Sequence, residues 1–250
     1  MQIKTDGFVI SDKSISDNTR LLTLVTRNLG VIRAFSRGSK SSKNKNFAAC
    51  QAFSYSDFII FKGKNKYTIN EANLKVSFFD IINDIEKLSL SQYFCEVILT
   101  LVAENFESEN ILRLLLNSIH CLKNDNTNPK IIKSVFEMRI LSMIGYMPNL
   151  LECSCCSDFK PLKMFFCFEK NSLLCDKCVS KNLTNLELSD SLLTALRYCI
   201  FADFSKMFAF ELNPINLKKL NKITESCLMN YIDKPLYSLD FYKKINTKND

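Results

Sequence analysis

Four of the eleven cysteines stand in two pairs whose spacing is typical of a metal site. Cys153 and Cys156 form one C-x2-C pair, and Cys175 and Cys178 form a second pair after eighteen intervening residues. Each C-x2-C turn directs two thiolates toward one point, so two turns can complete a tetrahedral sphere with bonds of about 2.3 Å. Four thiolates leave no position open for water or substrate. We therefore predict a structural zinc ion at these four residues.

Two further cysteines lie close to the pairs. Cys155 is offset by one position from the C-x2-C register, and Cys167 lies between the two pairs. We expect neither of them to be a ligand. The alternative is a site that has degenerated or is only partly occupied.

Several enzyme classes lack their required residues in this chain. A zinc deaminase needs an H-x-E element and a proline before its C-x-x-C pair, but Glu152 and Leu174 precede the two pairs here. The chain has one histidine and no G-x-x-x-x-G-K-[ST] phosphate loop, so a zinc-dependent nuclease and an ATPase are both disfavoured. We expect a protein that is not an enzyme.

The positive charge is concentrated in the first third of the chain. The formal net charge is +7, and residues 1–80 hold 13 basic and 6 acidic side chains, while the remaining residues hold 20 of each. Between Asn18 and Ser56 there are seven basic residues and no acid. Repulsion among these like charges falls when a polyanion binds, so the pattern favours nucleic-acid binding. The alternative is a solvated loop rich in lysine and asparagine.

The candidates for phosphate contact share a basic side chain and a place in or near this stretch. They are Arg33, Arg37, Lys40, Lys43, Lys45, Lys62, Lys64 and Lys66. Aromatic residues are interleaved with them, and an exposed ring can stack on a base of a single strand. Phe47 and Tyr67 are the two rings that we consider for that role.

The hydrophobic pattern changes from strand-like to helical near residue 80. Short β-branched or aromatic stretches separated by turns fall at residues 7–10, 21–26, 31–36, 53–61 and 67–74. Helical spacing follows at residues 88–106, 109–122 and 129–144, from Ser189 to about 210, and at 214–231. Five short strands suit an OB-fold barrel. The expected fold is α+β: an N-terminal five-stranded OB-fold barrel, then an α-helical domain with an inserted four-cysteine zinc knuckle.

These patterns predict three regions. Residues 1–80 form the OB-fold domain, residues 81–149 and 181–250 the helical domain, and residues 150–180 the zinc knuckle, in which residues 164–168 are apolar enough for a short strand. We expect no membrane span, because the longest apolar stretch is far shorter than the roughly 18 residues required. The N-terminus lacks the features of a signal peptide, so we expect a cytoplasmic location.

Beyond these local patterns, an ordered set of motifs resembles the RecO family of DNA-repair proteins. Its central part is the run FEMRIL at 136–141, then Gly145-Tyr146 with Pro148 and Leu150, then the first cysteine pair. The strands GFVI at 7–10 and RLLTL at 20–24 resemble the N-terminal part of the family. The chain departs from the family pattern at residues 17–19 and at Ser157, and neither departure touches a proposed ligand.

The resemblance implies a recombination mediator that binds single-stranded DNA and anneals complementary strands without nucleotide hydrolysis. It also implies partners: RecR, in some organisms RecF, the single-stranded-DNA-binding protein, and indirectly the RecA recombinase that is loaded onto coated strands. Such a protein would act at the nucleoid. A zinc-knuckle regulator that reads duplex DNA is the alternative, but it needs a basic recognition helix, and none stands out after residue 80.

Overall fold

The computed structural model describes residues 1–16, 18–37, 46–64, 66–125 and 127–246. The chain forms two compact units, one of Met1–Asn124 with Leu236–Asp250 and one of Asp125–Pro235. Each unit is described by itself below. The domain limits expected from the sequence stay a prediction.

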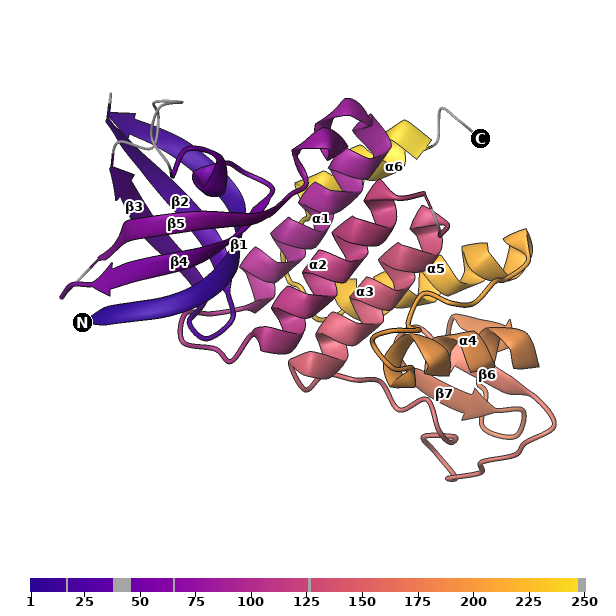
Figure 1. Ribbon diagram of the computed structural model, residues 1–250. Helices are drawn as coiled ribbons and strands as arrows, with labels where there is room; N and C mark the ends of the chain where they lie inside the picture. The colour runs from indigo at the N-terminus through magenta and orange to yellow at the C-terminus, as the bar shows by residue number, and fades with distance from the viewer. Residues whose placement is uncertain (17, 38–45, 65, 126, 247–250) are drawn as a thin grey trace. The chain divides into compact units, whose positions relative to one another are not determined.

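The N-terminal part of the first unit is a closed five-stranded barrel (Figure 1). Its strands are β1 (Gln2–Ser16), β2 (Thr19–Thr26), β3 (Gly30–Arg37), β4 (Ser54–Lys62) and β5 (Tyr67–Ser77). They follow one another around the barrel in the order β1-β2-β3-β5-β4, and only the β3–β5 pair is parallel. This topology confirms the predicted five-stranded barrel.

Alternation along the strands determines which side chains face the interior. In β3, Ile32 and Ala34 are buried in the core of the barrel, whereas Arg33 and Arg37 are exposed. Phe58 and Ile60 of β4 are buried in the same core. Because the period is two, the packing that closes the barrel also presents basic side chains on its outer surface.

Two helices follow the barrel in the same unit, α1 (Ile85–Leu101) and α2 (Glu109–Lys123). The sequence-based helix over 88–106 was too long, because the chain leaves α1 at Val102 and Glu104 forms a bridge to Gly30. Gly30 has φ +69°, and a Cβ atom there would lie 2.2 Å from the Ala103 carbonyl oxygen. Only glycine fits this contact between the β2–β3 turn and the segment after α1.

The last helix, α6 (Tyr237–Asn246), belongs to this unit and packs on α1 (Figure 1). Glu96 of α1 accepts hydrogen bonds from the backbone N–H groups of Tyr237 and Ser238, so it satisfies donors at the start of α6. Leu239 and Tyr242 form its buried side. This segment falls in the predicted helical region, but its pattern did not predict a helix at these residues.

The second unit contains three helices and a small sheet. The helices are α3 (Pro129–Met143), α4 (Asp190–Phe201) and α5 (Pro214–Met229). The strands are β6 (Met164–Cys167), β7 (Ser172–Cys175) and β8 (Asn185–Leu188), in the order β7-β6-β8. The predicted strand at 164–168 is confirmed, and the helix that begins after Ser189 ends at Phe201 rather than near 210.

Polar residues of the FEMRIL run are buried between helices. Glu137 is fully buried, lies 2.7 Å from the Lys133 ammonium, and accepts a hydrogen bond from Thr224 of α5 at 2.6 Å. Arg139 donates a hydrogen bond to the Ala202 carbonyl at the end of α4. These contacts tie α3 to α5 and α4, so the polar residues of the motif serve the packing of this unit.

Candidate nucleic-acid interface and metal centre

Four of the eight basic residues predicted to contact DNA line one cavity on the barrel. Arg33, Lys62, Lys64 and Lys66 surround a cavity of about 410 Å³, and Glu104 is its one acidic lining residue. We call this surface the basic cavity. The structure therefore gathers cations that are up to 33 positions apart in the sequence.

The strands and one turn fix the positions of these side chains. Arg33 is exposed on the outer face of β3, and Lys62 is the last residue of β4. The Gly63 N–H donates to the Lys66 carbonyl at 2.9 Å, which closes the turn between β4 and β5. The exposed side chains of Lys64 and Lys66 belong to this turn.

Ion pairing separates the basic residues of the barrel into two groups. Arg20 pairs with Asp12 at 2.9 Å, and Arg27 pairs with the buried Asp6 at 2.7 Å and with Glu109. Burial raises the pKa of Asp6, but hydrogen bonds from Arg27 and Tyr55 outweigh burial and lower it to about 2. Arg20 and Arg27 are thus engaged within the protein.

Lys75 of β5 likewise pairs with Asp57 at 2.6 Å, but four of the predicted DNA contacts have no such partner among the described residues. Within the described ranges, no carboxylate forms an ion pair with Arg33, Arg37, Lys64 or Lys66. Arg37 is exposed at the end of β3, outside the basic cavity. The other three predicted contacts, Lys40, Lys43 and Lys45, lie outside the described residues.

The two aromatic candidates differ in exposure. Tyr67 is 6 % exposed, its hydroxyl donates to Glu104 at 2.7 Å, and the Lys62 ammonium lies 5.4 Å from its ring centroid. The expectation that Tyr67 stacks on a base was therefore wrong for this arrangement, because its ring is covered. Phe47 is half-buried beneath the Arg20 guanidinium, which lies 5.3 Å from the ring centroid.

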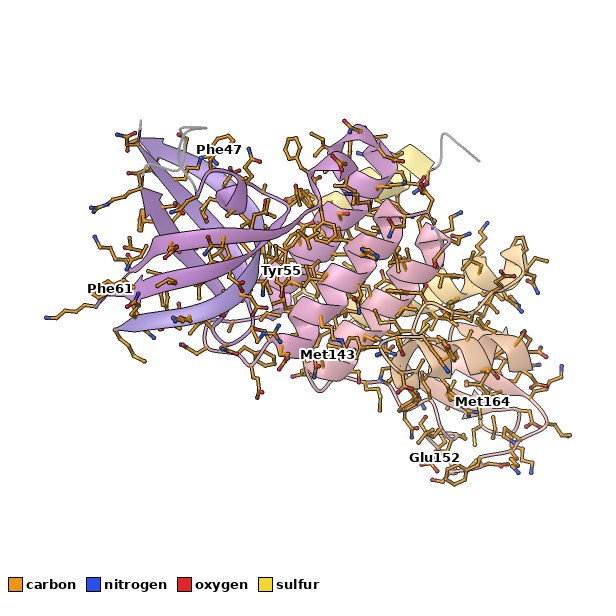
Figure 2. The ribbon with its side chains drawn as sticks, in the orientation of Figure 1. Phe47, Tyr55, Phe61, Met143, Glu152 and Met164 are labelled. Atoms are coloured by element: carbon orange, nitrogen blue, oxygen red, sulfur yellow. The ribbon has the colours of Figure 1, made fainter. Side chains whose placement is uncertain are left out.

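An exposed ring that the sequence analysis missed lies next to the basic cavity. Phe61 is 47 % exposed and precedes Lys62. Figure 2 shows Phe61 and Tyr55 toward opposite ends of β4. Strand alternation could have identified Phe61 as outward-facing, because Phe58 and Ile60 share the buried face.

The two cysteine pairs meet beside the small sheet of the second unit, near the labelled Glu152 and Met164 (Figure 2). The sulfur atoms of Cys153, Cys156, Cys175 and Cys178 all lie within 4.8 Å of one another. Tetrahedral bonds of about 2.3 Å imply sulfur–sulfur distances of roughly 3.8 Å, and Cys156 and Cys175 are 3.6 Å apart. This four-cysteine cluster fits a metal ion and could hold one.

Backbone donors favour the ionised form of one thiol in the cluster. Burial raises the pKa of Cys153, but backbone N–H groups of Cys155, Cys156 and Cys175 lower it to about 6. The Cys175 N–H lies 3.3 Å from the Cys153 sulfur. Neighbouring thiols, Cys175 first among them, raise the pKa of Cys178. Four thiolates this close repel one another, so they require a cation to ionise together.

The two extra cysteines are outside the four-cysteine cluster. Cys155 is exposed, and its sulfur lies 3.8 Å from the Lys170 ammonium. Cys167 is buried, and its sulfur lies 3.6 Å from a carboxylate oxygen of Glu169. The structure thus brings together the four thiols that the spacing singled out.

None of the helices in the described part of the chain is both long and apolar enough to cross a bilayer.

Comparison with known families covers nearly the whole chain. Residues 1–78 match the family "Recombination protein O N terminal", and residues 82–240 match "Recombination protein O C terminal". The first match corresponds to the barrel and the second contains the four-cysteine cluster.

Full-length relatives carry one name. The chain is similar to "DNA repair protein RecO" of Acetivibrio thermocellus, with 32% identity over 98% of this chain and 97% of the relative. The protein of that name from Alkaliphilus metalliredigens is 27% identical over 98% of this chain and all of the relative, and that from Clostridium perfringens is 25% identical over 97% and 98%. The barrel with unpaired cations and the four-cysteine cluster fit the two family matches. These matches and the full-length relatives show that the chain belongs to the RecO family of non-enzymatic recombination mediators in DNA repair.

Proposed function

We propose that the protein binds single-stranded DNA through its barrel, anneals complementary strands, and helps to load the RecA recombinase onto coated single strands. The observation that carries this proposal is the basic cavity, where four cations of three barrel segments meet a single carboxylate. Arg37, Lys40, Lys43 and Lys45 are proposed to extend the same contact.

The chemistry required is phosphate neutralisation without bond breaking. Each lysine or arginine that contacts a phosphate releases condensed counterions, so binding weakens as salt rises and shows little dependence on sequence. Phe61 adds an exposed ring beside Lys62, and stacking on a base is sequence-tolerant too. A contact of this kind holds a strand and can release it, which annealing requires.

We propose that the four-cysteine cluster holds zinc with a structural role. Four sulfur ligands complete the coordination, so zinc bound there would supply folding free energy and would activate no water. Cys153, Cys156, Cys175 and Cys178 would hold the ion, and their connection to β7 supports the small sheet around them.

The family suggests the partners of this activity. We propose RecR, the single-stranded-DNA-binding protein and, where it is present, RecF as protein partners. RecA is involved indirectly, as the recombinase that is loaded onto the strand. Because the substrate is chromosomal DNA, we expect the protein to act in the cytoplasm at the nucleoid. We also propose that these roles are divided among the three regions predicted from the sequence: the barrel, the helical region and the zinc knuckle.

Competition between single-stranded and duplex DNA tests the proposal against the regulator alternative. A labelled single-stranded oligonucleotide is bound first, and unlabelled single strands or duplexes of several sequences then compete in a fluorescence anisotropy assay. We expect single strands of any sequence to compete better than every duplex, because flexible strands can follow the basic cavity and stack on exposed rings. Preference for one duplex sequence would instead favour a regulator.

A further inference from the structure

A second cavity in the 125–235 unit has features of a ligand site that the proposed function does not use. It has a volume of about 500 Å³, and its lining includes Tyr146, Tyr231, Lys170, Asn171 and Asn230. We call it the tyrosine cavity. None of these residues belongs to the four-cysteine cluster.

The ends of two helices place the two tyrosines. At the end of α3, marked by Met143 in Figure 2, Gly145 has φ +87° and donates to the Ser142 carbonyl, while the Tyr146 N–H donates to the Leu141 carbonyl at 2.9 Å. This is a Schellman motif, which fixes the direction of the chain at Tyr146. Tyr231 follows α5, and its N–H donates to the Leu228 carbonyl at 3.1 Å.

The two rings contact each other and are still accessible. Their centroids are 3.9 Å apart with an interplanar angle of 41°, yet Tyr146 is 54 % and Tyr231 36 % exposed. Hydrogen bonding of the Tyr231 hydroxyl to Tyr146 raises the pKa of Tyr231, so this phenol stays neutral near pH 7. Because the two rings already restrain each other, they lose little conformational entropy when a flat ligand stacks on them.

Asn171 supplies an unused hydrogen-bond acceptor at this cavity. Its Oδ1 atom is buried and has no hydrogen-bond partner among the residues that the structure describes. The residue lies in the turn between β6 and β7 with φ +49°, a conformation that asparagine tolerates. A buried acceptor without a partner costs free energy, and a rotation of the Asn171 side chain toward an N–H or amino donor of a ligand would recover it.

Charges at the tyrosine cavity favour a base over a phosphate. The C-terminal ends of α3 and α5 carry partial negative charge, and Lys170 is the one cation in the lining. Glu169 also lines the cavity, and its carboxylate accepts hydrogen bonds from the Thr184 N–H at 2.9 and 3.1 Å. The buried thiol of Cys227 is neutral, because burial raises its pKa.

We infer that the tyrosine cavity takes an unpaired nucleobase of single-stranded DNA, stacked on Tyr146 and hydrogen-bonded through an amino or imino group to Asn171. Lys170, at the rim of this cavity, would contact the phosphate that adjoins the bound base. This inference rests on the proposed function, since it adds a second contact with the same polymer. It differs from the basic cavity in depending on stacking, so the contribution of Tyr146 to affinity is nearly independent of salt.

Single-tryptophan variants test the inference, because the natural chain contains no tryptophan. Tyr146→Trp places the only indole at the cavity, and Phe159→Trp places it at a site that is 63 % exposed in the same unit and outside the cavity lining. We expect oligo(dT) to quench the fluorescence of the first variant and to leave the second unchanged. Equal quenching of both, or quenching of neither while DNA is bound, would overturn the inference and leave the proposed function standing.

Affinity measurements give a second readout. We expect Tyr146→Leu to weaken single-strand binding about tenfold, the effect of one lost stacking contact, with an unchanged salt slope. Tyr146→Phe should keep wild-type affinity, and Asn171→Gly, which suits the backbone conformation, should weaken binding of bases that carry an N–H donor. Wild-type affinity in Tyr146→Leu would contradict the inference. Failure of the folded natural chain to bind single strands at all would overturn the proposed function, and the inference with it.

Discussion

Replacement of Cys175 by serine is expected to abolish metal binding and to lower the free energy of unfolding of the 125–235 unit by about 5 kcal/mol or more. Cys175 is fully buried, and its sulfur lies 3.6 Å from that of Cys156. Structural zinc contributes folding free energy directly, and an incomplete ligand set loses most of that contribution. Zinc content by mass spectrometry and thermal unfolding measure the two effects.

Cys155→Ser is the matched control for this experiment. Cys155 is exposed, lies next to Cys156 in the sequence, and is outside the four-cysteine cluster. The control should retain one zinc per chain and wild-type stability. Equal effects of the two substitutions, or a natural chain that folds normally without bound metal, would contradict the structural role of zinc.

Charge reversal at the β4–β5 turn is expected to weaken single-strand binding by roughly 100-fold at low salt. The variant combines Lys64→Glu with Lys66→Glu, two exposed cations of the basic cavity. Since each phosphate contact on a single strand contributes about 0.7 to the slope of log K against log salt, two lost contacts should flatten it by about 1.4. Anisotropy titrations at several salt concentrations give both quantities.

A variant of equal net charge separates a local contact from a general field effect. Lys160→Glu combined with Lys181→Glu changes two exposed lysines of the other unit. This control should lose far less affinity and keep nearly all of the wild-type slope. If both double variants behave alike, net charge and not the basic cavity determines binding.

Features that depend on local sequence were predicted well. The period-two pattern of β3 places Ile32 and Ala34 inside and Arg33 outside, and β4 shows the same alternation. The cysteine pairs could be recognised because a C-x2-C turn is a local geometry, and two of them suffice for one cluster.

Features that depend on contacts between distant segments were missed. Tyr67 begins a strand and looks available, but Glu104, from the segment after α1, binds its hydroxyl. The tyrosine cavity forms only because the ends of α3 and α5 meet, and this contact cannot be predicted from the sequence around either helix. The start of α6 is stabilised by Glu96, more than a hundred positions earlier in the chain, so its N-terminal signal is absent from the neighbouring sequence.

The central claim, that this RecO-family protein anneals single strands without nucleotide hydrolysis, is tested most directly by an annealing assay. Two complementary oligonucleotides, labelled with a donor and an acceptor dye, are mixed with the purified protein without ATP, both bare and coated by the cognate single-stranded-DNA-binding protein. We predict faster annealing in both cases, an effect that fades as salt rises and is lost in the Lys64→Glu, Lys66→Glu variant. Folded, zinc-loaded protein that accelerates annealing of neither bare nor coated strands would contradict the account.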